Sequence, residues 1–154
     1  MADSRSARFG ASRVSERKRL LFLCTGNSAR SQMAEGLLRH EAGDRFDVFS
    51  AGTHPSLVRL EAIAVMNEIG IDISAHRSKS IDEFLGQELD TVITVCDNAK
   101  ESCPVFLGKT QRLHWPFEDP ASVQGTEEDR KDAFRKTRDR IHGRIMRFLG
   151  EGQA

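Results

Sequence analysis

The chain has 154 residues, a formal net charge of zero, and hydrophobic residues at 38% of its positions. This length suffices for one sizeable core, so a single domain is expected. The balanced charge disfavours nucleic-acid binding, and no apolar run approaches the roughly 18 residues of a membrane span.

The first 18 residues differ in composition from the rest. Serine and arginine alternate there, with few acidic or apolar side chains. We expect residues 1–18 to be a disordered basic N-terminal extension and residues 19–150 to form the single domain. Such a start is also typical of an organelle transit peptide, but apolar residues for an amphipathic face are scarce. With no secretory signal either, a reducing, cytoplasmic location is expected.

Strand and helix patterns alternate along the remaining chain. The apolar run 20–23 predicts a buried strand, and 31–39 predicts the helix that follows it. Residues 46–50 predict a second strand, and 59–69 a helix that ends at Gly70. The later expected elements are a short helix at 81–85, strands at 90–95 and 111–114, and a helix at 127–149 that buries Phe134, Ile141, Ile145 and Phe148. The alternation is typical of a three-layer α/β/α domain with a four-stranded parallel sheet.

A cysteine and an arginine flank the loop between the first strand and the first helix. The segment reads Cys24-Thr25-Gly26-Asn27-Ser28-Ala29-Arg30, followed by Ser31. A helix N-terminus offers unpaired N–H groups and partial positive charge, so residues 25–31 are expected to bind an oxyanion. Arg30 adds a planar cationic fork, and the same positive environment predicts a Cys24 thiolate at neutral pH.

Other residues of this loop have local roles that the sequence predicts. Gly26 bends freely, Asn27 tolerates a left-handed backbone, and Ser31 either donates to the Cys24 sulfur or caps the helix. The spacing of a nucleotide-binding Walker loop is absent. A cysteine at the end of a buried strand is most often a packing residue. The strand, loop and helix around Cys24 favour the oxyanion site instead.

Two further cysteines stand on one later segment. Cys96 follows the expected strand 90–95, and parallel strands end at the same edge of a sheet, so Cys96 is expected near Cys24. The polar stretch from Cys96 to Cys103 has weak helical signals and is interpreted as a redox switch. The alternatives are two inert core thiols or a zinc site, but the short paired spacing of zinc ligands is missing. No metal is expected.

Asp119 is the candidate general acid. Pro120 biases it toward an extended conformation in a loop, where catalytic groups are common. An Asp-Pro pair alone is more often a turn, and Glu118 and Asp97 remain alternatives. The scattered histidines are interpreted as structural, because no pair has metal-ligand spacing; they include His54, His76 and His114.

Taken together, these motifs resemble a known family. The chain resembles the thioredoxin-coupled arsenate reductases, which share the fold of the low-molecular-weight protein tyrosine phosphatases. The resemblance covers residues 19–149, and its motifs lie at 24–36, 50–52, 70–74, 95–96, 103–104, 114–115 and 119–120.

The resemblance implies a three-thiol mechanism. Cys24 would attack arsenate held by the loop and Arg30, while Asp119 protonates the departing hydroxide. Cys96 would then attack Cys24 and release arsenite. Cys103 would resolve that disulfide, and thioredoxin would reduce the resulting Cys96–Cys103 pair. No cofactor is implied, and we expect a monomer with arsenate and thioredoxin as its partners.

Two departures separate the chain from the phosphatases of this family. Those relatives carry tyrosines after the Asp-Pro pair, whereas this chain has Ala121 and Ser122 and no tyrosine at all. The departures favour a reductase, with a small phosphatase as the alternative. A redox sensor or arsenite-binding module is the third interpretation.

A further departure concerns potassium. Some family members bind K⁺ through Asn, Glu and Ser, which Asn27, Glu35 and Ser50 match, and through two oxygen ligands after a histidine. This chain has Arg77 and Lys79 at those last positions. A tethered ammonium competes well with a hydrated ion, so Lys79 or Arg77 is expected in the ion's place, without potassium dependence.

Overall fold

The computed structural model describes residues 17–97 and 109–151. Cys103 and residues 1–16 of the expected extension lie outside this range, and the domain boundaries stay a prediction. Within the described residues, no helix is long and apolar enough to cross a membrane.

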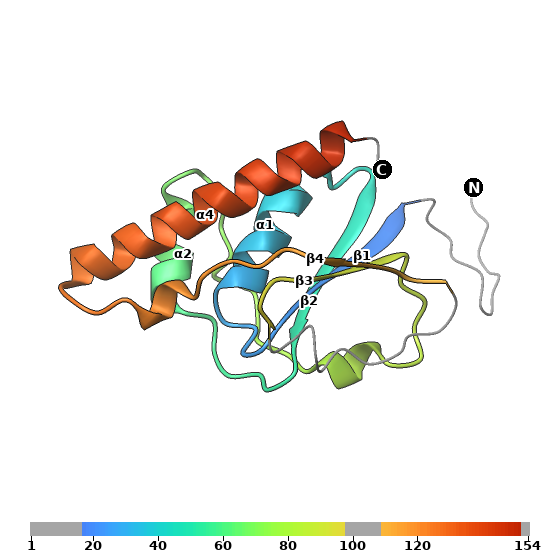
Figure 1. Cartoon of the computed structure of the whole chain (residues 1–154), viewed down its shortest axis with the longest axis horizontal. Coiled ribbons are helices and arrows are strands. Elements are labelled where there is room, and N and C mark those ends of the chain that lie inside the picture. The colour runs from blue at the N-terminus through green and yellow to red at the C-terminus, as the bar shows by residue number, and fades with distance from the viewer. Residues whose placement is uncertain (1–16, 98–108, 152–154) are drawn as a thin grey trace.

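A four-stranded parallel sheet forms the centre of the fold (Figure 1). Its strands are β1 (Lys18–Cys24), β2 (Phe46–Gly52), β3 (Thr91–Thr94) and β4 (Gln111–His114), in the order β2-β1-β3-β4. Leu23 of β1 pairs with Thr94 of β3. The C-terminal ends of these two central strands therefore lie side by side, as the sequence predicted.

The described helices are α1 (Arg30–Ala42), α2 (Leu60–Asn67) and α4 (Glu127–Gly150), with the 3₁₀ helices η1 (Ile81–Phe84) and η2 (Pro120–Ser122). The three α-helices contact one another and lie together above the sheet in Figure 1. η1 lies on the opposite side, below the sheet in the same view.

Aromatic contacts of β2 show that both faces of the sheet are covered. Phe46 packs on Phe148 of α4, with 6.0 Å between ring centroids, whereas Phe49 packs on Phe84 of η1 at 5.5 Å. Positions 46 and 49 differ by an odd number, so their side chains leave the strand on opposite faces. The predicted three-layer α/β/α fold with a four-stranded parallel sheet is confirmed.

Helix boundaries differ from the expectations by one to three residues, which is ordinary for helix ends. α1 is longer than predicted, and α2 ends at Asn67, with a turn leading to Gly70 at φ +80°. α4 begins at a capping box between Thr126 and Asp129. Its four predicted core residues, Phe134, Ile141, Ile145 and Phe148, are all buried.

Candidate active site

The predicted oxyanion loop joins β1 to α1 at the C-terminal edge of the sheet. Cys24 is the last residue of β1 and is buried, and Arg30 is the first residue of α1. Asn27, between them, has a φ of +48°, a left-handed conformation that asparagine tolerates. The loop therefore turns sharply at the N-terminus of α1, where free N–H groups and the helix dipole favour an anion.

The buried side chain of Asn27 fixes the shape of this loop. Its Nδ2 donates to Ser31 Oγ at 2.8 Å and to Ser50 Oγ at 3.0 Å. Its Oδ1 accepts from Gln32 Nε2 at 2.9 Å and from the Lys79 N–H at 2.9 Å. All of its hydrogen-bonding capacity is thus directed to groups on four other residues.

The loop backbone is held by two further side chains. Ser78 Oγ donates to the Gly26 carbonyl at 2.8 Å, and Gln32 Nε2 donates to the Asn27 carbonyl at 3.1 Å. Sequence reasoning missed the roles of Ser78 and Gln32. A glutamine in the first turn of a helix is no signal by itself. Its role depends on the fold, which brings the His76 ring and the Arg77 carbonyl to the same side chain.

Cys24 lies in contact with a second thiol. Ser31 Oγ donates to the Cys24 sulfur at 3.2 Å, and the Cys24 side chain is hydrogen-bonded to Cys96. The Cys96 bond, followed by burial, raises the pKa of Cys24 well above its usual value, although Ser31 and Arg30 act to lower it. The expected Cys24 thiolate is therefore wrong for this arrangement, because the Cys96 hydrogen bond and burial both stabilise the protonated thiol.

Cys96 is placed where its strand position predicted. It follows β3 at the same edge as Cys24, is buried, and is unbridged, as is Cys24. Its sulfur lies 3.2 Å from Thr25 Oγ1, a contact within hydrogen-bond range for sulfur. The sequence alone does not predict this contact between Thr25 and Cys96.

Arg30 and the Asp-Pro loop are tied together. Arg30 Nη1 donates to the Phe117 carbonyl at 2.9 Å, two residues before Asp119. Asp119 is exposed, and its Oδ1 accepts the Ala121 N–H at 2.9 Å at the start of η2. The hydrogen bond between Arg30 and Phe117 therefore anchors the loop that carries Asp119 to the oxyanion loop.

Of the two alternative acids, Asp97 is paired with a histidine and Glu118 is almost fully exposed. Asp97 Oδ1 lies 2.9 Å from His114 Nε2, and His114 Nδ1 lies 2.7 Å from Thr94 Oγ1. Glu118 is 93% exposed and lies 3.9 Å from Arg140. His114 thus links the segment after β3 to β4, as a structural histidine does.

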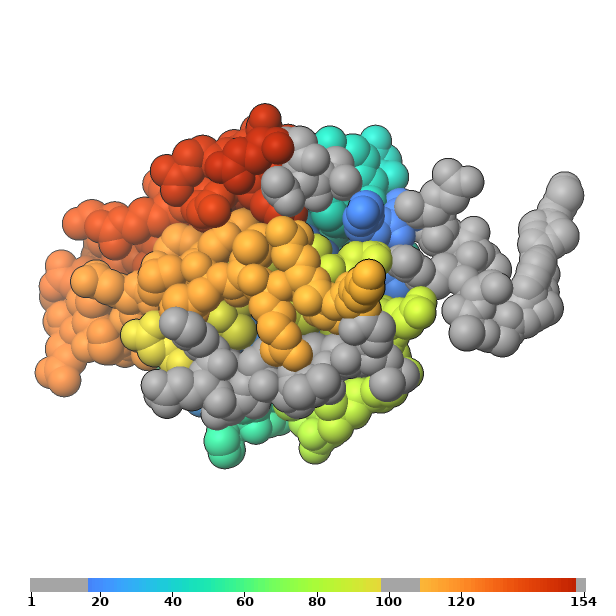
Figure 2. Space-filling view, turned by 45° about the vertical axis from the view of Figure 1, so that its right-hand side comes forward, coloured from blue at the N-terminus to red at the C-terminus, as the bar shows by residue number. Residues whose placement is uncertain are grey.

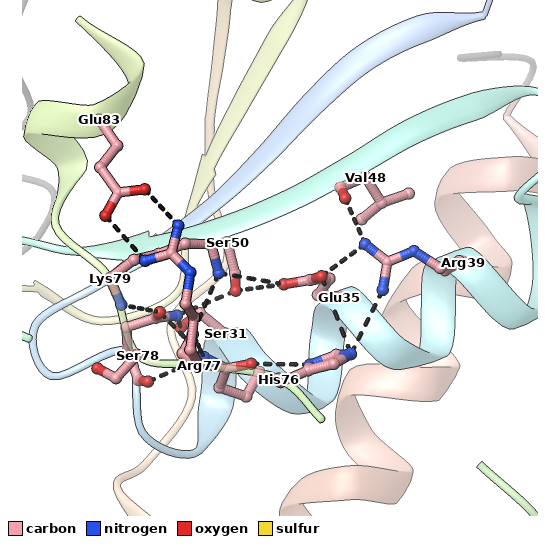
Figure 3. A network of polar contacts seen from close by, with 12 residues as sticks. Ser31, Glu35, Arg39, Val48, Ser50, His76, Arg77, Ser78, Lys79 and Glu83 are labelled. Atoms are coloured by element: carbon pink, nitrogen blue, oxygen red, sulfur yellow. Dashed lines mark hydrogen bonds and ion pairs between the residues drawn. The ribbon is translucent and has the colours of Figure 1, made fainter. Parts of the chain in front are cut away.

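Beside the loop, Glu35 is the centre of a polar network (Figure 3). One carboxylate oxygen accepts from Ser50 and lies 3.9 Å from Lys79 Nζ, and the other accepts from Arg39 and lies 3.9 Å from His76 Nε2. Burial lowers the pKa of both His76 and Lys79. Both side chains are mostly buried, so the carboxylate is surrounded by cationic or protonatable groups.

Of the two cations expected in the place of potassium, Lys79 is the one that lies near Glu35. Its ammonium also donates to the Arg77 carbonyl at 3.2 Å. Arg77 instead forms a two-pronged ion pair with Glu83, at 2.6 and 2.9 Å, away from the carboxylate of Glu35. His54 is exposed and His76 hydrogen-bonds Gln32 at 2.8 Å.

Comparisons with known proteins agree with this geometry. The family model of the low molecular weight phosphotyrosine protein phosphatases matches residues 19–153. An arsenate reductase of Halalkalibacterium halodurans is 46% identical over 137 residues, which are 89% of this chain and 99% of that protein. An arsenate reductase of Bacillus subtilis is 43% identical over 138 residues, with 90% and 99% covered.

Solved structures give the same result. One of an arsenate reductase in the phosphate binding state has a TM-score of 0.70 and 34% identity, covering 87% of this chain and 98% of that one. The thioredoxin-dependent arsenate reductase Cg_ArsC1' of Corynebacterium glutamicum has a TM-score of 0.71 and 28% identity, covering 90% and 63%. The chain belongs to the low molecular weight phosphotyrosine protein phosphatase family, and bacterial arsenate reductases are among its relatives.

Proposed function

We propose that this protein is an arsenate reductase, which converts arsenate to arsenite through Cys24, Cys96 and Cys103 and is regenerated by thioredoxin. The observation that carries the proposal is the contact between Cys24 and Cys96 at the rim of an oxyanion loop. A phosphatase needs the first thiol but has no use for the second. A reductase needs both within bonding reach.

In the first step, arsenate occupies the oxyanion loop. The N–H groups of residues 25–31, the α1 dipole and the Arg30 guanidinium stabilise its oxygens. The thiol proton of Cys24 passes to an oxygen of the bound arsenate as the sulfur forms a bond to arsenic. One arsenate oxygen leaves as hydroxide, which takes a proton from Asp119. The tie between Arg30 and the Phe117 carbonyl supports this role, because it brings the acid's loop to the arginine.

In the second step, electrons pass to arsenic. The Cys96 thiolate attacks the Cys24 sulfur, a sulfur–sulfur bond forms, and the sulfur–arsenic bond breaks. Its electron pair reduces As(V) to As(III), so arsenite leaves and a Cys24–Cys96 disulfide remains. The Thr25 hydroxyl at 3.2 Å supports this step, since it can stabilise the Cys96 thiolate by donating a hydrogen bond.

In the third step, Cys103 attacks Cys96 and frees Cys24. The resulting Cys96–Cys103 disulfide exchanges with the dithiol of thioredoxin, which restores all three thiols. This part of the proposal rests on the sequence position of Cys103 and on the thioredoxin-dependent structural neighbour. A reducing, cytoplasmic setting suits the cycle, and the protein acts as a monomer.

The second candidate function is hydrolysis of phosphate esters, which the family of the chain favours. The loop and Asp119 would suffice for it. The residues after Pro120 are Ala121 and Ser122, so no tyrosine is available there to bind an aryl phosphate. We therefore rank phosphatase activity as a weak side reaction. A redox sensor ranks third, because it would need neither Arg30 nor Asp119.

The deciding experiment is arsenate-dependent NADPH oxidation with thioredoxin and thioredoxin reductase. We expect multiple turnovers for the wild type and a single one for Cys103→Ser. Arg30→Ala and Asp119→Asn should lose most turnover but keep arsenite binding. If the wild type instead hydrolyses p-nitrophenyl phosphate and leaves arsenate unreduced, the reductase assignment is wrong. Full turnover in Arg30→Ala would instead favour the redox sensor, because a sensor reacts through its thiols and needs no oxyanion site.

A further inference from the structure

A cavity of about 540 Å³ lies between α4 and the segment that follows β4. Arg140, Arg144 and Arg147 line its α4 side, and Trp115 and Phe117 line the other. Figure 2 shows the orange surface of the β4 segment directly beneath the red surface of α4. None of these three arginines takes part in the reaction proposed above.

The arginines form a cationic stripe on one face of the helix. Positions 140, 144 and 147 are separated by four and three residues, so their side chains project from the same side of α4. Like charges at this spacing repel one another. Among the described residues, Arg140 forms an ion pair with Glu118 at 3.9 Å. The Glu118 side chain is 93% exposed, so this pair is weak.

Two buried donors in the same place lack an acceptor among the residues that the structure describes. Trp115 is only 4% exposed, and its indole Nε1 is buried without a hydrogen-bond partner. Nη1 of Arg144 is likewise buried without a hydrogen-bond partner among the described residues. The Arg144 guanidinium is stacked over the Trp115 ring, 4.6 Å from its centroid. An unsatisfied buried donor costs about 1–3 kcal/mol, and the Arg144 guanidinium that carries one of them lines the cavity.

The lining also sets the class of the missing partner. Three guanidinium groups line the space, so the partner is an anion that accepts hydrogen bonds. Trp115, Pro116 and Phe117 give the cavity an apolar wall. Small-molecule sites measure roughly 300–1,000 Å³, and a bare oxyanion would leave most of this one empty.

We propose that this cavity binds a small-molecule oxyanion carried on a flat apolar group, the chemistry shared by aryl phosphonates and nucleotides. The oxyanion accepts hydrogen bonds from the guanidinium groups of Arg140, Arg144 and Arg147 and neutralises the arginine stripe. The flat group lies against the wall formed by residues 115–117. The proposal is independent of the arsenate reaction, because the oxyanion loop contributes no residue to the cavity.

The protein carries its own probe for this site. Trp115 is the single tryptophan of the chain, and there is no tyrosine, so intrinsic fluorescence reports on the cavity directly. The full chain is titrated with phenylphosphonate, adenosine 5′-monophosphate and inorganic phosphate. We expect a saturable change with phenylphosphonate or the nucleotide, about tenfold tighter than with phosphate. The tighter of the two organic ligands identifies the kind of flat group.

Variants then locate the binding. Arg140→Gln/Arg147→Gln should weaken it about tenfold or more, whereas Lys131→Gln/Lys136→Gln removes the same charge from α4 outside the cavity and should leave it unchanged. Arg144→Gln should abolish it if its stack on Trp115 survives.

Three results would overturn the proposal: no saturable change with any probe, equal affinity for inorganic phosphate and phenylphosphonate, or indifference to Arg140→Gln/Arg147→Gln. Circular dichroism of each variant establishes that it is folded. The double variant changes two exposed side chains, so the test does not depend on whether Arg144→Gln folds.

Discussion

The hydroxyl of Thr25 lies 3.2 Å from the sulfur of Cys96, although 71 residues separate them in the chain. Thr25 follows β1 and Cys96 follows β3, and the two strands are neighbours in the sheet. The parallel pairing thus joins the oxyanion loop to the second thiol. The same contact makes Thr25 a positioning residue for the proposed attack of Cys96 on Cys24.

Replacing Thr25 by valine tests this contact. Without the hydroxyl, the Cys96 thiolate loses a hydrogen bond worth about 1–1.5 kcal/mol, so arsenite release should slow about tenfold. The measurement is a single-turnover rapid quench with enzyme in excess and no thioredoxin. Thr25→Ser keeps the hydroxyl and should recover most of the rate. A Thr25→Val rate equal to that of the wild type would remove Thr25 from the mechanism.

A second prediction concerns the ionisation of Cys24. Its hydrogen bond with Cys96 is the largest cause of its raised pKa, so Cys96→Ala should lower that pKa. The pH midpoint of Cys24 alkylation by iodoacetamide, followed by mass spectrometry, should move to lower pH. Ser31→Ala should move the midpoint the other way, because the Ser31 hydrogen bond lowers the pKa. A Cys96→Ala midpoint at or above the wild-type value would contradict the assigned cause.

The neighbourhood of Cys24 and Cys96 could be predicted from sequence for one physical reason. Both follow β-branched or apolar runs, and parallel strands end at a common edge, so the adjacency follows from topology alone. The charge state of Cys24 could not be predicted in the same way. The loop predicts a lowered pKa, but the contact with Cys96 and the burial raise it, and both depend on packing.

The contacts around Glu35 could not be predicted in full from the sequence either. The sequence places a cation after residue 76, but Arg77 and Lys79 are equally good candidates there. The fold decides between them, because Arg77 pairs with Glu83 of η1 while Lys79 turns toward Glu35. The cavity beside Trp115 left no sequence signal either, since it needs the turn after β4 to meet three arginines of α4.

His76 gives a prediction for the pH dependence of stability. Burial lowers its pKa in the folded state, while the unfolded chain has an ordinary histidine pKa of about 6.5. Below that value the unfolded chain binds a proton that the folded one resists, so stability falls as pH decreases. The wild type should therefore lose more stability between about pH 7 and pH 5 than His76→Gln, measured by urea unfolding.

The control for this titration is His54→Gln, which removes an exposed histidine and should retain the wild-type slope. Acidic residues away from position 76 contribute to both proteins alike, so the difference between slopes reports on His76 and its contact with Glu35. Parallel stability curves for wild type and His76→Gln would mean that the folded protein accepts the proton on His76 without cost.

Lys79→Gln tests whether an ammonium takes the place of a bound cation. The side chains of Lys79 and Glu35 are only 13% and 8% exposed, so removing the positive charge should cost about 1–3 kcal/mol of folding free energy. Arg39 still pairs with Glu35, which keeps the loss moderate. The ammonium of Lys79 lies near two oxygens, of the Glu35 carboxylate and the Arg77 carbonyl, and oxygens are the ligands of a hard cation. Lys79→Gln should therefore regain activity and melting temperature in KCl relative to NaCl at equal ionic strength, whereas the wild type should respond equally to both salts.

Arg77→Gln breaks only an exposed ion pair with Glu83 and should behave like the wild type. Potassium activation of the wild type would show that the ammonium of Lys79 does not occupy the ion's place.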